Sequence, residues 1–469
     1  MVVIGGGAGG LAVAAGAASL GAKVALVEKH KLGGDCLWYG CVPSKTLLKS
    51  AKVAQAMRSA QRWGLPAHES ALNLTAVMQR VAAVIKEIAP NDSPERFRSL
   101  GVEVLVGQGA FSDARTFVVG ARALSARVFV IATGSRPTVP PITGIDAVPF
   151  LTNETLFDLR EPVPHLLVVG GGAVGSELAQ AFRRLGSAVT VVDVAPQILS
   201  HEDSDVAAVV YERLKAEGIE YQLGASIVRI EGARGDLRIT LKPSERAEHT
   251  LACTHVLLAT GRTPNVEDLG LERAGVRLDN GRVVSDSGLR TTNPRIYVCG
   301  DVAGGYQFTH LAEHQAGIIL RRAIFKLRWA KPSSTLPWCT FTDPELARVG
   351  LSEAEARKQH VAHRIYRFPF EELDRGRIDG EPEGFAKLIT SPRGKLLGAA
   401  IVGARAGELI HEYALALGKH MRASDVSATI HVYPTFAQIN RRVADQRLKE
   451  GLTPRSKAWL KRIFQLRGV

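Results

Sequence analysis

The sequence predicts an α/β protein that contains two Rossmann-like units. The main observation is a glycine-rich loop between an apolar strand and a helix, which occurs near the N-terminus and again near residue 170. A second observation is length, because 469 residues exceed what one hydrophobic core usually holds. We therefore expect several domains, two of them built on parallel sheets.

The first glycine loop follows a short run of valine and isoleucine and contains Gly5, Gly7 and Gly10. In such a loop Gly5 makes the tight turn, Gly7 lets the backbone approach a pyrophosphate, and Gly10 lets helix and strand pack closely. The helix that follows offers free N–H groups to phosphates. The next strand ends at Glu28, where a carboxylate accepts hydrogen bonds from a ribose. This order predicts a dinucleotide site.

The same order recurs in the second loop, with Gly170, Gly172 and Gly175, and the following strand ends at Asp193. Two such sites suggest two nucleotides, with a hydride passing between them. An acid at this place favours a free ribose 2′-hydroxyl and repels a 2′-phosphate. We therefore favour NAD(H) in the second site, while NADP(H) is not excluded.

Three further strand ends carry polar residues or glycines. The strand over 128–131 is followed by Ala132-Thr133-Gly134, a matching strand over 256–258 by Ala259-Thr260-Gly261, and residues 295–300 lead to Asp301. Taken alone, each is as well explained by a strand that simply ends in a turn.

The two glycine loops, the two Ala-Thr-Gly turns and three further motifs resemble those of the FAD-dependent pyridine nucleotide–disulfide oxidoreductases. The resemblance covers nearly the whole chain, and the motifs follow one another along it in the order typical of the family. The three motifs are GGDCLWYGCVPSK (33–45), FTDPELARVG (341–350) and HVYPT (431–435). The resemblance implies an FAD-binding domain over 1–145, an NAD(P)-binding domain over 146–267, a return to the first domain over 268–332, and an α+β dimerisation domain over 333–452. It also implies a homodimer whose active sites take residues from both chains.

The resemblance assigns cofactor roles as well. It implies that Gly5, Gly7 and Gly10 lie at the FAD pyrophosphate, Glu28 at the adenosine ribose, and Asp301 at the ribitol or pyrophosphate side. Thr133, Gly134 and Gly261 are expected to line the nucleotide sites. His310 is expected near the flavin, although a structural role is the commoner one for such a histidine.

The cysteines of GGDCLWYGCVPSK, Cys36 and Cys41, are separated by four residues. Structural zinc usually requires closer pairs and further ligands, so no metal site is predicted. A thiol pair near a flavin can instead cycle between disulfide and dithiol. Lys45 would share a helix face with Cys41, and a nearby ammonium lowers a thiol pKa. The resemblance implies that Cys41 stacks near the flavin, that Cys36 attacks the substrate, and that Lys45 lies near flavin N5 and pairs with Glu177.

The closing motif departs from the family pattern. Disulfide reductases of the family usually carry His-Pro-Thr and then a Glu, an acid–base pair given to the partner's site. Here Tyr433 precedes the proline and Gln438 takes the Glu position. A phenol with a pKa of about 10 is a poorer base than imidazole at neutral pH.

Three explanations remain open for this departure. In an extended segment His431 would share a face with Tyr433 and could take over the proton transfer, although a packed or surface histidine is favoured. Mercuric reductases carry a tyrosine here, where it helps to bind Hg(II), but this chain lacks their late cysteines because none follows Cys339. The electron acceptor could also need no proton transfer from the enzyme at this point, as with a quinone or a protein-bound disulfide.

The formal net charge of +13 is concentrated near the C-terminus. Residues 441–469 hold nine Lys or Arg against two acids, a net +7, and no nucleic-acid motif accompanies them. Thr453-Pro454 predicts the start of a basic amphipathic helix over 453–469, with apolar residues at Trp459, Leu460, Ile463 and Phe464 and Lys457, Lys461, Arg462 and Arg467 around them. Such a helix suits an anionic membrane or an acidic partner, but packing on its own dimer is favoured.

No stretch of the sequence has the apolar length of a membrane span, and the apolar N-terminus lacks a basic leader, so we expect a cytoplasmic protein. The sequence predicts a homodimeric flavoenzyme that uses NADH or NADPH, FAD and the Cys36–Cys41 pair to reduce a disulfide or oxidise a dithiol, as dihydrolipoamide dehydrogenases do. A mercuric or quinone reductase is the alternative, and a redox-sensing flavoprotein without turnover is the rival from another class.

Overall fold

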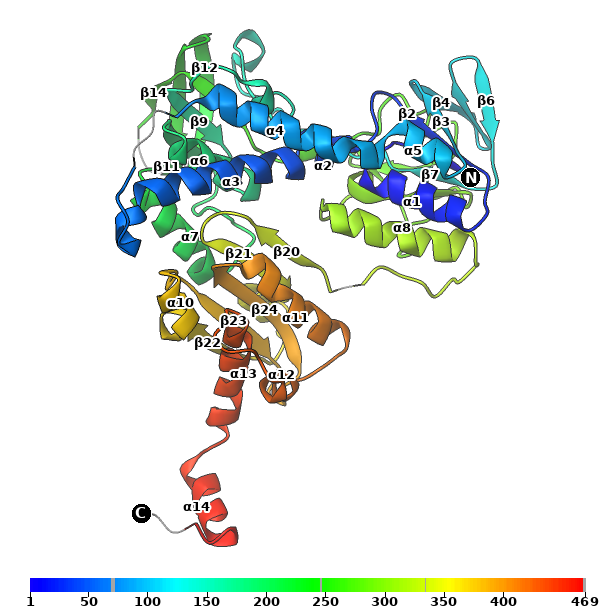
Figure 1. The fold of residues 1–469 in the computed structure, drawn as a ribbon. Helices are drawn as coiled ribbons and strands as arrows, with labels where there is room; N and C mark the ends of the chain where they lie inside the picture. The colour runs from blue at the N-terminus through cyan, green and yellow to red at the C-terminus, as the bar shows by residue number, and fades with distance from the viewer. Residues whose placement is uncertain (69–71, 245–246, 334, 467–469) are drawn as a thin grey trace.

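The computed structural model describes residues 1–68, 72–244, 247–333 and 335–466, and confirms the α/β fold class. Two modules with parallel sheets lie at opposite ends of the upper part of the molecule, and a third domain with an antiparallel sheet lies below them (Figure 1). Among the helices in the described residues, none is both long and apolar enough to cross a bilayer.

The first module is built on a five-stranded parallel sheet in the order β19-β7-β1-β2-β3. The short strand β1 is central and fully buried, which explains its run of β-branched residues. Helices α1 and α8 pack together against this sheet. The bounds are β1 (Val2–Ile4), α1 (Ala8–Ser19), β2 (Val24–Glu28), α5 (Pro94–Ser99), β3 (Val102–Val106), β7 (Phe129–Ile131), β19 (Ile296–Val298) and α8 (Thr309–Ala323).

The second module repeats this plan with a four-stranded parallel sheet in the order β11-β10-β9-β15. Each module also carries a three-stranded antiparallel sheet, β4-β5-β6 in the first and β12-β13-β14 in the second. The bounds of the second module are β9 (His165–Val169), α6 (Ala173–Arg184), β10 (Ala188–Asp193), α7 (Ser204–Ala216), β11 (Glu220–Leu223), β12 (Ala225–Ala233), β13 (Asp236–Pro243), β14 (His249–Cys253) and β15 (His255–Leu258).

Short elements join the two modules. The strands β8 and β16 pair with each other directly after the two Ala-Thr-Gly turns, and β17 and β18 form a small hairpin before the chain re-enters the first sheet. These and the first module's antiparallel strands have the bounds β4 (Gly109–Asp113), β5 (Thr116–Val119), β6 (Arg122–Ser125), β8 (Ser135–Pro137), β16 (Arg262–Pro264), β17 (Leu278–Asp279) and β18 (Arg282–Val283).

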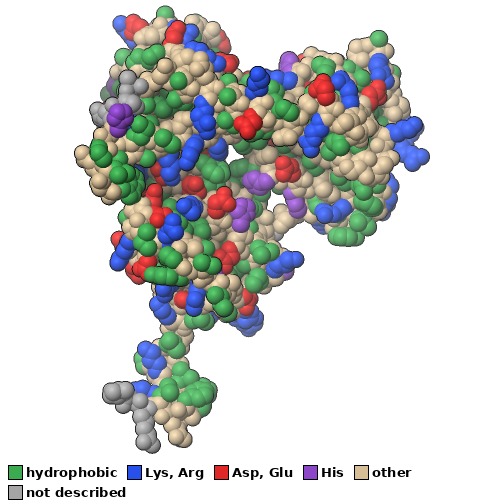
Figure 2. Space-filling view, in the orientation of Figure 1, with side chains coloured by type: hydrophobic (Ala, Val, Ile, Leu, Met, Phe, Trp, Pro, Cys, Tyr) green, Lys and Arg blue, Asp and Glu red, His purple; other side chains and the backbone are tan. Residues whose placement is uncertain are grey.

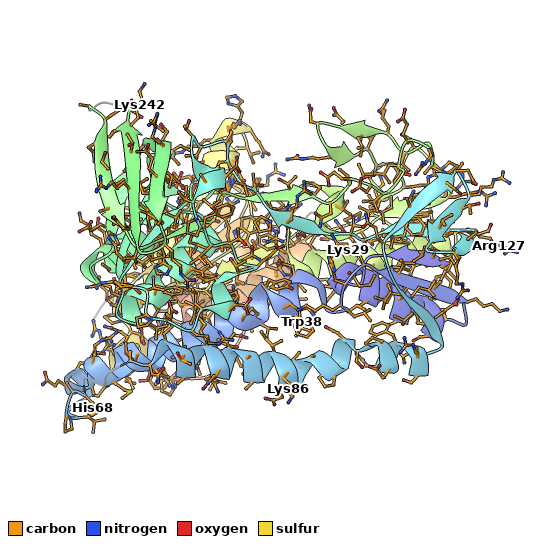
Figure 3. All side chains as sticks on the ribbon, turned by 90° about the horizontal axis from the view of Figure 1, so that it is seen from above. Lys29, Trp38, His68, Lys86, Arg127 and Lys242 are labelled. Carbon is orange, nitrogen blue, oxygen red and sulfur yellow. The ribbon has the colours of Figure 1, made fainter. Side chains whose placement is uncertain are left out.

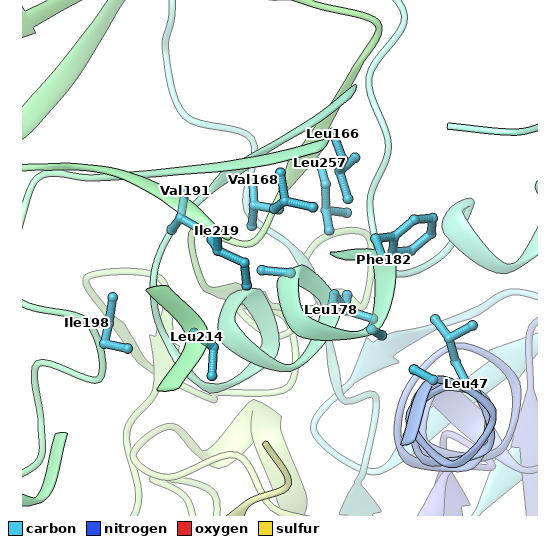
Figure 4. Close-up of a cluster of buried hydrophobic side chains, with 14 of the residues drawn as sticks. Leu47, Leu166, Val168, Leu178, Phe182, Val191, Ile198, Leu214, Ile219 and Leu257 are labelled. Atoms are coloured by element: carbon cyan, nitrogen blue, oxygen red, sulfur yellow. The ribbon is translucent and has the colours of Figure 1, made fainter. Parts of the chain in front are cut away.

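Two long helices, α3 (Cys41–Arg58) and α4 (Leu74–Ile88), span the gap between the modules. They run side by side, with His68 beyond the outer end of α3 (Figure 3). Helix α3 begins beside the first module, after the short helix α2 (Gly34–Trp38). Its residue Leu47 belongs to the buried core of the second module, with Leu178 and Phe182 of α6 (Figure 4). The cysteine-bearing helix is therefore anchored in the second module.

The third domain is a five-stranded antiparallel sheet in the order β20-β21-β24-β23-β22. Helices α11 and α13 cover it and share its core, which includes Tyr413 and Ile439. The bounds are β20 (Pro337–Thr340), β21 (Glu345–Gly350), α9 (Glu353–Lys358), β22 (Arg364–Pro369), α10 (Asp374–Ile378), β23 (Phe385–Thr390), β24 (Leu396–Gly403), α11 (Ala406–Gly418), α12 (Ala423–Ala428) and α13 (Gln438–Glu450).

The chain continues past α13 into a separate helix, α14 (Pro454–Ile463), which projects away from the body (Figure 1). The Thr453 hydroxyl accepts a hydrogen bond from the Ser456 N–H at 3.1 Å, and Pro454 takes the first helical position, as the sequence predicted. No residue of α14 is buried. Arg467 lies outside the described residues.

A buried ion network joins the second module to the third domain. Arg184 of α6 donates to the Glu217 carboxylate at 2.6 and 2.8 Å and to Asp343 at 2.9 Å, and its side chain is only 3% exposed. Asp343 also accepts from Lys52 of α3 at 3.0 Å. Despite burial, these two cations hold the pKa of Asp343 below its usual range. The network therefore ties α3, α6 and the third domain together.

Substituting Arg184→Met should lower the free energy of unfolding by about 3 kcal/mol, because it removes the buried cation shared by Glu217 and Asp343 and leaves them only the more exposed Arg213 and Lys52. Chemical denaturation measures this loss. Arg122→Met is the matched control, since Arg122 and Glu103 form an exposed pair whose removal should cost less than about 1 kcal/mol. Equal losses for the two variants would show that the network contributes nothing beyond a surface pair.

Candidate functional site

A single cavity of about 1790 Å³ connects the two modules and the third domain. Both glycine loops line it, together with the cysteine segment and residues from β20. The space-filling view shows the molecule hollowed between the two upper modules (Figure 2). Such a volume is large enough for more than one extended ligand.

The first glycine loop has the geometry that its sequence predicts. Gly5 has a φ of +106°, and a Cβ there would lie 2.3 Å from the Ala132 carbonyl oxygen. A Cβ on Gly10 would lie 1.9 Å from the Gly5 oxygen, whereas Gly7 has only one atom within 4 Å, at 3.7 Å. The Glu28 carboxylate accepts from the Gly6 N–H at 2.7 Å. The loop thus leaves an open backbone at the start of α1, which fits a pyrophosphate.

The second glycine loop repeats this geometry. Gly170 has a φ of +107°, and a Cβ on Gly175 would lie 1.8 Å from the Gly170 oxygen. A Cβ on Gly172 would meet no described atom within 4 Å, so the packing of the chain does not require glycine there. Asp193 accepts from the Gly171 N–H at 2.6 Å and from Ala195 at 2.8 Å. The open space above Gly172 fits a second nucleotide.

Each Ala-Thr-Gly turn lies against one of the glycine loops, since a Cβ on Gly5 would meet Ala132 and a Cβ on Gly170 would meet Ala259. Gly134 and Gly261 both have positive φ, of 67° and 107°, and a Cβ on either would meet no described atom within 4 Å. The Thr133 hydroxyl donates to the Asn265 carbonyl oxygen at 2.7 Å. The turns are therefore exposed to the cavity, which both of them line.

Asp301 lies at the floor of the cavity, where it accepts from the Ser135 hydroxyl at 2.6 Å. Burial raises the pKa of Asp301, and Arg262, 3.9 Å away, opposes that shift. Arg262 also pairs with Asp35 of the cysteine segment at 3.0 Å. Sequence reasoning did not single out Arg262 or Asp35, and the only signal was that Arg262 directly follows the second Ala-Thr-Gly turn.

Cys36 lies in α2 and Cys41 begins α3, and both sulfurs are free in this structure. The Cys36 thiol is half-buried and hydrogen-bonded to Cys41, and both effects raise the pKa of Cys36 well above its usual value. The same hydrogen bond, with the Lys45 ammonium and the Thr309 hydroxyl, lowers the pKa of Cys41 to about 6 against the effect of burial. At neutral pH the pair therefore holds one proton, on Cys36.

Lys45 lies one turn along α3 from Cys41, and its ammonium is 2.8 Å from the Glu177 carboxylate of α6. Burial acts to lower the pKa of Lys45, but Glu177 outweighs it and the pKa is raised. The Glu177 side chain is only 5% exposed, and its other oxygen accepts from the Phe341 N–H of the third domain at 2.9 Å. The structure thus places these two predicted residues in direct contact.

An aromatic wall, Tyr306, Phe308, His310 and Trp338, lines the cavity near Cys41. Neighbouring rings are close to parallel, with interplanar angles of 13–29° and centroids 5.2–6.1 Å apart. His310 Nε2 faces the Pro337 carbonyl oxygen at 2.8 Å, so the ring is tied to the wall. Sequence reasoning identified only His310, and the alternation of Tyr306, Phe308 and His310 was the available signal.

The loop with His431 and Tyr433 is not a strand, and the two side chains have different surroundings. His431 is packed: Nδ1 lies 2.9 Å from the Thr429 carbonyl oxygen, Nε2 lies 3.0 Å from the Glu412 carboxylate, and the side chain is 5% exposed. Tyr433 is 63% exposed. The extended segment that a shared face would require is not formed, and His431 is packed against Glu412, as the favoured interpretation of this histidine had it.

Substituting Lys45→Met should raise the pKa of Cys41 from about 6 by at least about one unit, since the ammonium that favours the thiolate is lost. A pH titration of the ultraviolet thiolate absorbance in the reduced enzyme measures the shift, with a Cys41→Ser blank. Lys52→Met is the control, because Lys52 lies on the same helix but pairs with Asp343. An unchanged Cys41 pKa in Lys45→Met would contradict the assignment.

The two glycines Gly172 and Gly175 should respond differently to alanine. Gly172→Ala should fold normally but weaken NADH binding by about tenfold, because the methyl group occupies space left for the nucleotide. Gly175→Ala should lower the free energy of unfolding by about 3 kcal/mol through its clash with Gly170. Denaturation and NADH titration give the two readouts, and normal NADH affinity in Gly172→Ala would refute the second nucleotide site.

Comparison with known proteins places this geometry in a family. Residues 1–316 match the family model "Pyridine nucleotide-disulphide oxidoreductase", and residues 336–443 match the dimerisation domain of that family. Dihydrolipoyl dehydrogenase of Chlamydia muridarum (strain MoPn / Nigg) is 34% identical, with 93% of this chain and 94% of the relative covered. Mercuric reductase of Streptomyces lividans is 33% identical, with coverage of 93% and 94%.

Among solved structures, the chain is similar to a Cu(II) complex of the HOCl-induced flavoprotein disulfide reductase RclA from Escherichia coli. The TM-score is 0.85 at 26% sequence identity, and 95% of this chain and 99% of that chain are covered. The curated relatives and the structural neighbour agree in class, and the family implies FAD, a pyridine nucleotide and a dimerisation domain. The chain belongs to the pyridine nucleotide–disulfide oxidoreductase family and is an NAD(P)H-dependent flavoprotein oxidoreductase.

Proposed function

We propose that this flavoenzyme takes electrons from NADH and delivers them through the Cys36–Cys41 pair to a disulfide substrate. The observation that carries the proposal is that both thiols line the cavity shared with the two glycine loops, with the Thr309 hydroxyl 3.8 Å from the Cys41 sulfur and Lys45 one helical turn away. The lowered pKa of Cys41 places the thiolate there, beside Lys45, while Cys36 keeps the proton. Neither thiol is fully buried, unlike Cys253 and Cys299, so the pair is accessible in a way that inert core cysteines are not.

The residues around the cavity support both cofactors. FAD, held by the first glycine loop with Glu28 and Asp301, would accept a hydride from the nicotinamide and release two electrons to the cysteine pair. Asp193 would bind the ribose of the nicotinamide nucleotide and disfavours a 2′-phosphate, so we propose NADH as the donor. Glu177 and Lys45 would lie where the two nucleotide sites meet, and their ion pair would fix the position of the cysteine helix relative to the second module.

The reduced pair would transfer its electrons by thiol–disulfide exchange. Cys36 passes its proton to the Cys41 thiolate and attacks one sulfur of the substrate, which forms a mixed disulfide and releases the first product thiolate. Cys41 then loses that proton and attacks Cys36, which forms the Cys36–Cys41 disulfide and releases the second thiolate. The pair loses two electrons and the substrate gains two, while the Cys36 proton and one proton from water complete the two product thiols.

We propose that this exchange proceeds without the family's usual His–Glu pair. Tyr433 and Gln438 occupy the positions where the resemblance places that pair. His431 does not replace it, because the Thr429 carbonyl oxygen and the Glu412 carboxylate occupy both ring nitrogens. The hydrogen bond between Cys36 and the Cys41 thiolate provides the internal route for the proton instead.

A second candidate acceptor is a soft or redox-active metal ion, and the exposed phenol of Tyr433 favours it. Mercuric reductases are among the relatives, and RclA is described as a Cu(II) complex. Two thiolates suit such ions. The dithiol supplies two electrons, enough to reduce one Hg(II) to the metal or two Cu(II) to Cu(I). Within the described ranges no group of three or more His, Cys, Asp or Glu forms a resident metal site, so the ion would be a substrate.

An acceptor screen tests the proposal. NADH oxidation by the purified enzyme is followed with lipoamide, glutathione disulfide, Hg(II), Cu(II) and a quinone. We expect turnover with a disulfide, and Cys36→Ser should reduce it at least about a thousandfold while NADH still bleaches the flavin. Cys253→Ala is the matched control, because Cys253 is buried in β14, and its turnover should stay normal.

Tyr433→Phe distinguishes the two candidates. If a disulfide is the substrate, loss of an exposed phenol should change the rate by less than about threefold, since Cys36 and Cys41 handle the proton. If a metal ion is the substrate, loss of the phenol should raise its KM by about tenfold. Full disulfide turnover in Cys36→Ser would overturn the proposal that electrons pass through the Cys36–Cys41 pair.

A further inference from the structure

Helix α14 and the residues around it form a tail with charge of one sign only. Residues 451–469 hold five Lys or Arg, at positions 455, 457, 461, 462 and 467, and contain no Asp or Glu. The dimerisation-domain match ends at residue 443, so this tail lies outside the matched family domains. The thiol relay does not use it.

The tail is also amphipathic. Trp459 and Ile463 are one helical turn apart, Leu460 neighbours them on the same side, and Lys457 and Lys461 are one turn apart on another. Figure 2 shows hydrophobic side chains gathered on one side of the projecting tail. This pattern is typical of a helix that lies in an interface between water and an apolar phase.

The apolar side of α14 is largely exposed to solvent. Trp459 is 62% exposed and Phe464 is 64% exposed, and no residue of α14 is buried. The side-chain hydrogen bonds at the start of the helix stay within the tail, where the Ser456 hydroxyl bonds the Gly451 and Thr453 carbonyl oxygens. The helix is therefore formed and capped by its own residues, with its apolar side free to meet a partner.

We propose that α14 binds an anionic lipid surface, with Trp459, Ile463 and Phe464 inserted at the boundary between headgroups and acyl chains. Ten residues are too few to cross a bilayer, so the helix would lie in the plane of the surface. Tryptophan suits that depth because its ring is apolar and its N–H remains able to reach water. The basic side chains would contact the lipid phosphates.

The sequence alone favoured the partner subunit as the surface on which the tail packs. The distribution of charge favours an anionic lipid surface instead. The tail carries five of the thirteen net positive charges, so the remaining 450 residues still carry +8. A second copy of the chain therefore repels the tail overall, whereas an anionic bilayer attracts it. A homodimer would also present two such helices, and two weak anchors on one particle bind far more tightly than one.

Vesicle co-sedimentation of the full-length holoenzyme tests the proposal. The probes are vesicles of phosphatidylcholine alone and vesicles with added phosphatidylglycerol. We expect at least about tenfold stronger binding to the anionic vesicles, weakened by added salt. Substituting Lys457, Lys461 and Arg462 together by Gln should lower the partition coefficient by about a hundredfold. Substituting Trp459 and Ile463 by Ser should lower it by at least about tenfold.

The matched control removes the same charge from the body by substituting Arg127, Arg238 and Lys242, all exposed, by Gln. We expect the partition coefficient of this body variant to be less than about threefold below that of the wild type. NADH oxidation should stay normal in every variant. Equal binding to neutral vesicles, or equal losses in the tail and body triple variants, would overturn the proposal. A tail variant that never bound vesicles but dissociated the dimer in sedimentation velocity would assign the partner subunit as the occupant.

Discussion

The ion pair between Lys45 and Glu177 is the contact on which the arrangement of the site depends. Lys45 belongs to the helix that begins with Cys41, and Glu177 belongs to the helix that follows the second glycine loop. The second oxygen of Glu177 accepts the Phe341 N–H, so one buried carboxylate connects the cysteine helix, the second module and the third domain. A charge this deeply buried is stable only when it is fully paired, so the three parts are held to one geometry.

The same pairing explains why two cysteines only five residues apart differ in chemistry. Cys41 lies within reach of the Lys45 ammonium and the Thr309 hydroxyl, and both favour its thiolate. Cys36 keeps its proton, donates a hydrogen bond to that thiolate and lies near the Asp35 carboxylate, so its own ionisation is disfavoured. The different chemistry of the two thiols is therefore set both by neighbours along the chain, Lys45 and Asp35, and by Thr309 of α8, which tertiary packing brings to the pair.

Local features of the fold and site were predictable from the sequence, and distant contacts were not. The glycine loops follow from short-range sterics, since a Cβ on Gly10 would strike the Gly5 oxygen five residues away. The cap at Thr453 is equally local. By contrast, Arg262 meets Asp35 across more than two hundred residues, and His431 turns inward only because Glu412 of α11 lies there. Spacing patterns carry no information on such encounters, which tertiary packing decides.

The recurrence of one plan in both modules has an evolutionary consequence. Each module runs from strand to glycine loop to helix to strand, ends that strand in an acid, and adds a three-stranded antiparallel sheet. Even the bond from the acid to the loop recurs, from Gly6 to Glu28 at 2.7 Å and from Gly171 to Asp193 at 2.6 Å. Such repetition is what duplication of one ancestral gene segment leaves behind. The cysteine segment follows only the first glycine unit in the sequence, so it is a feature of the chain that the repetition does not account for.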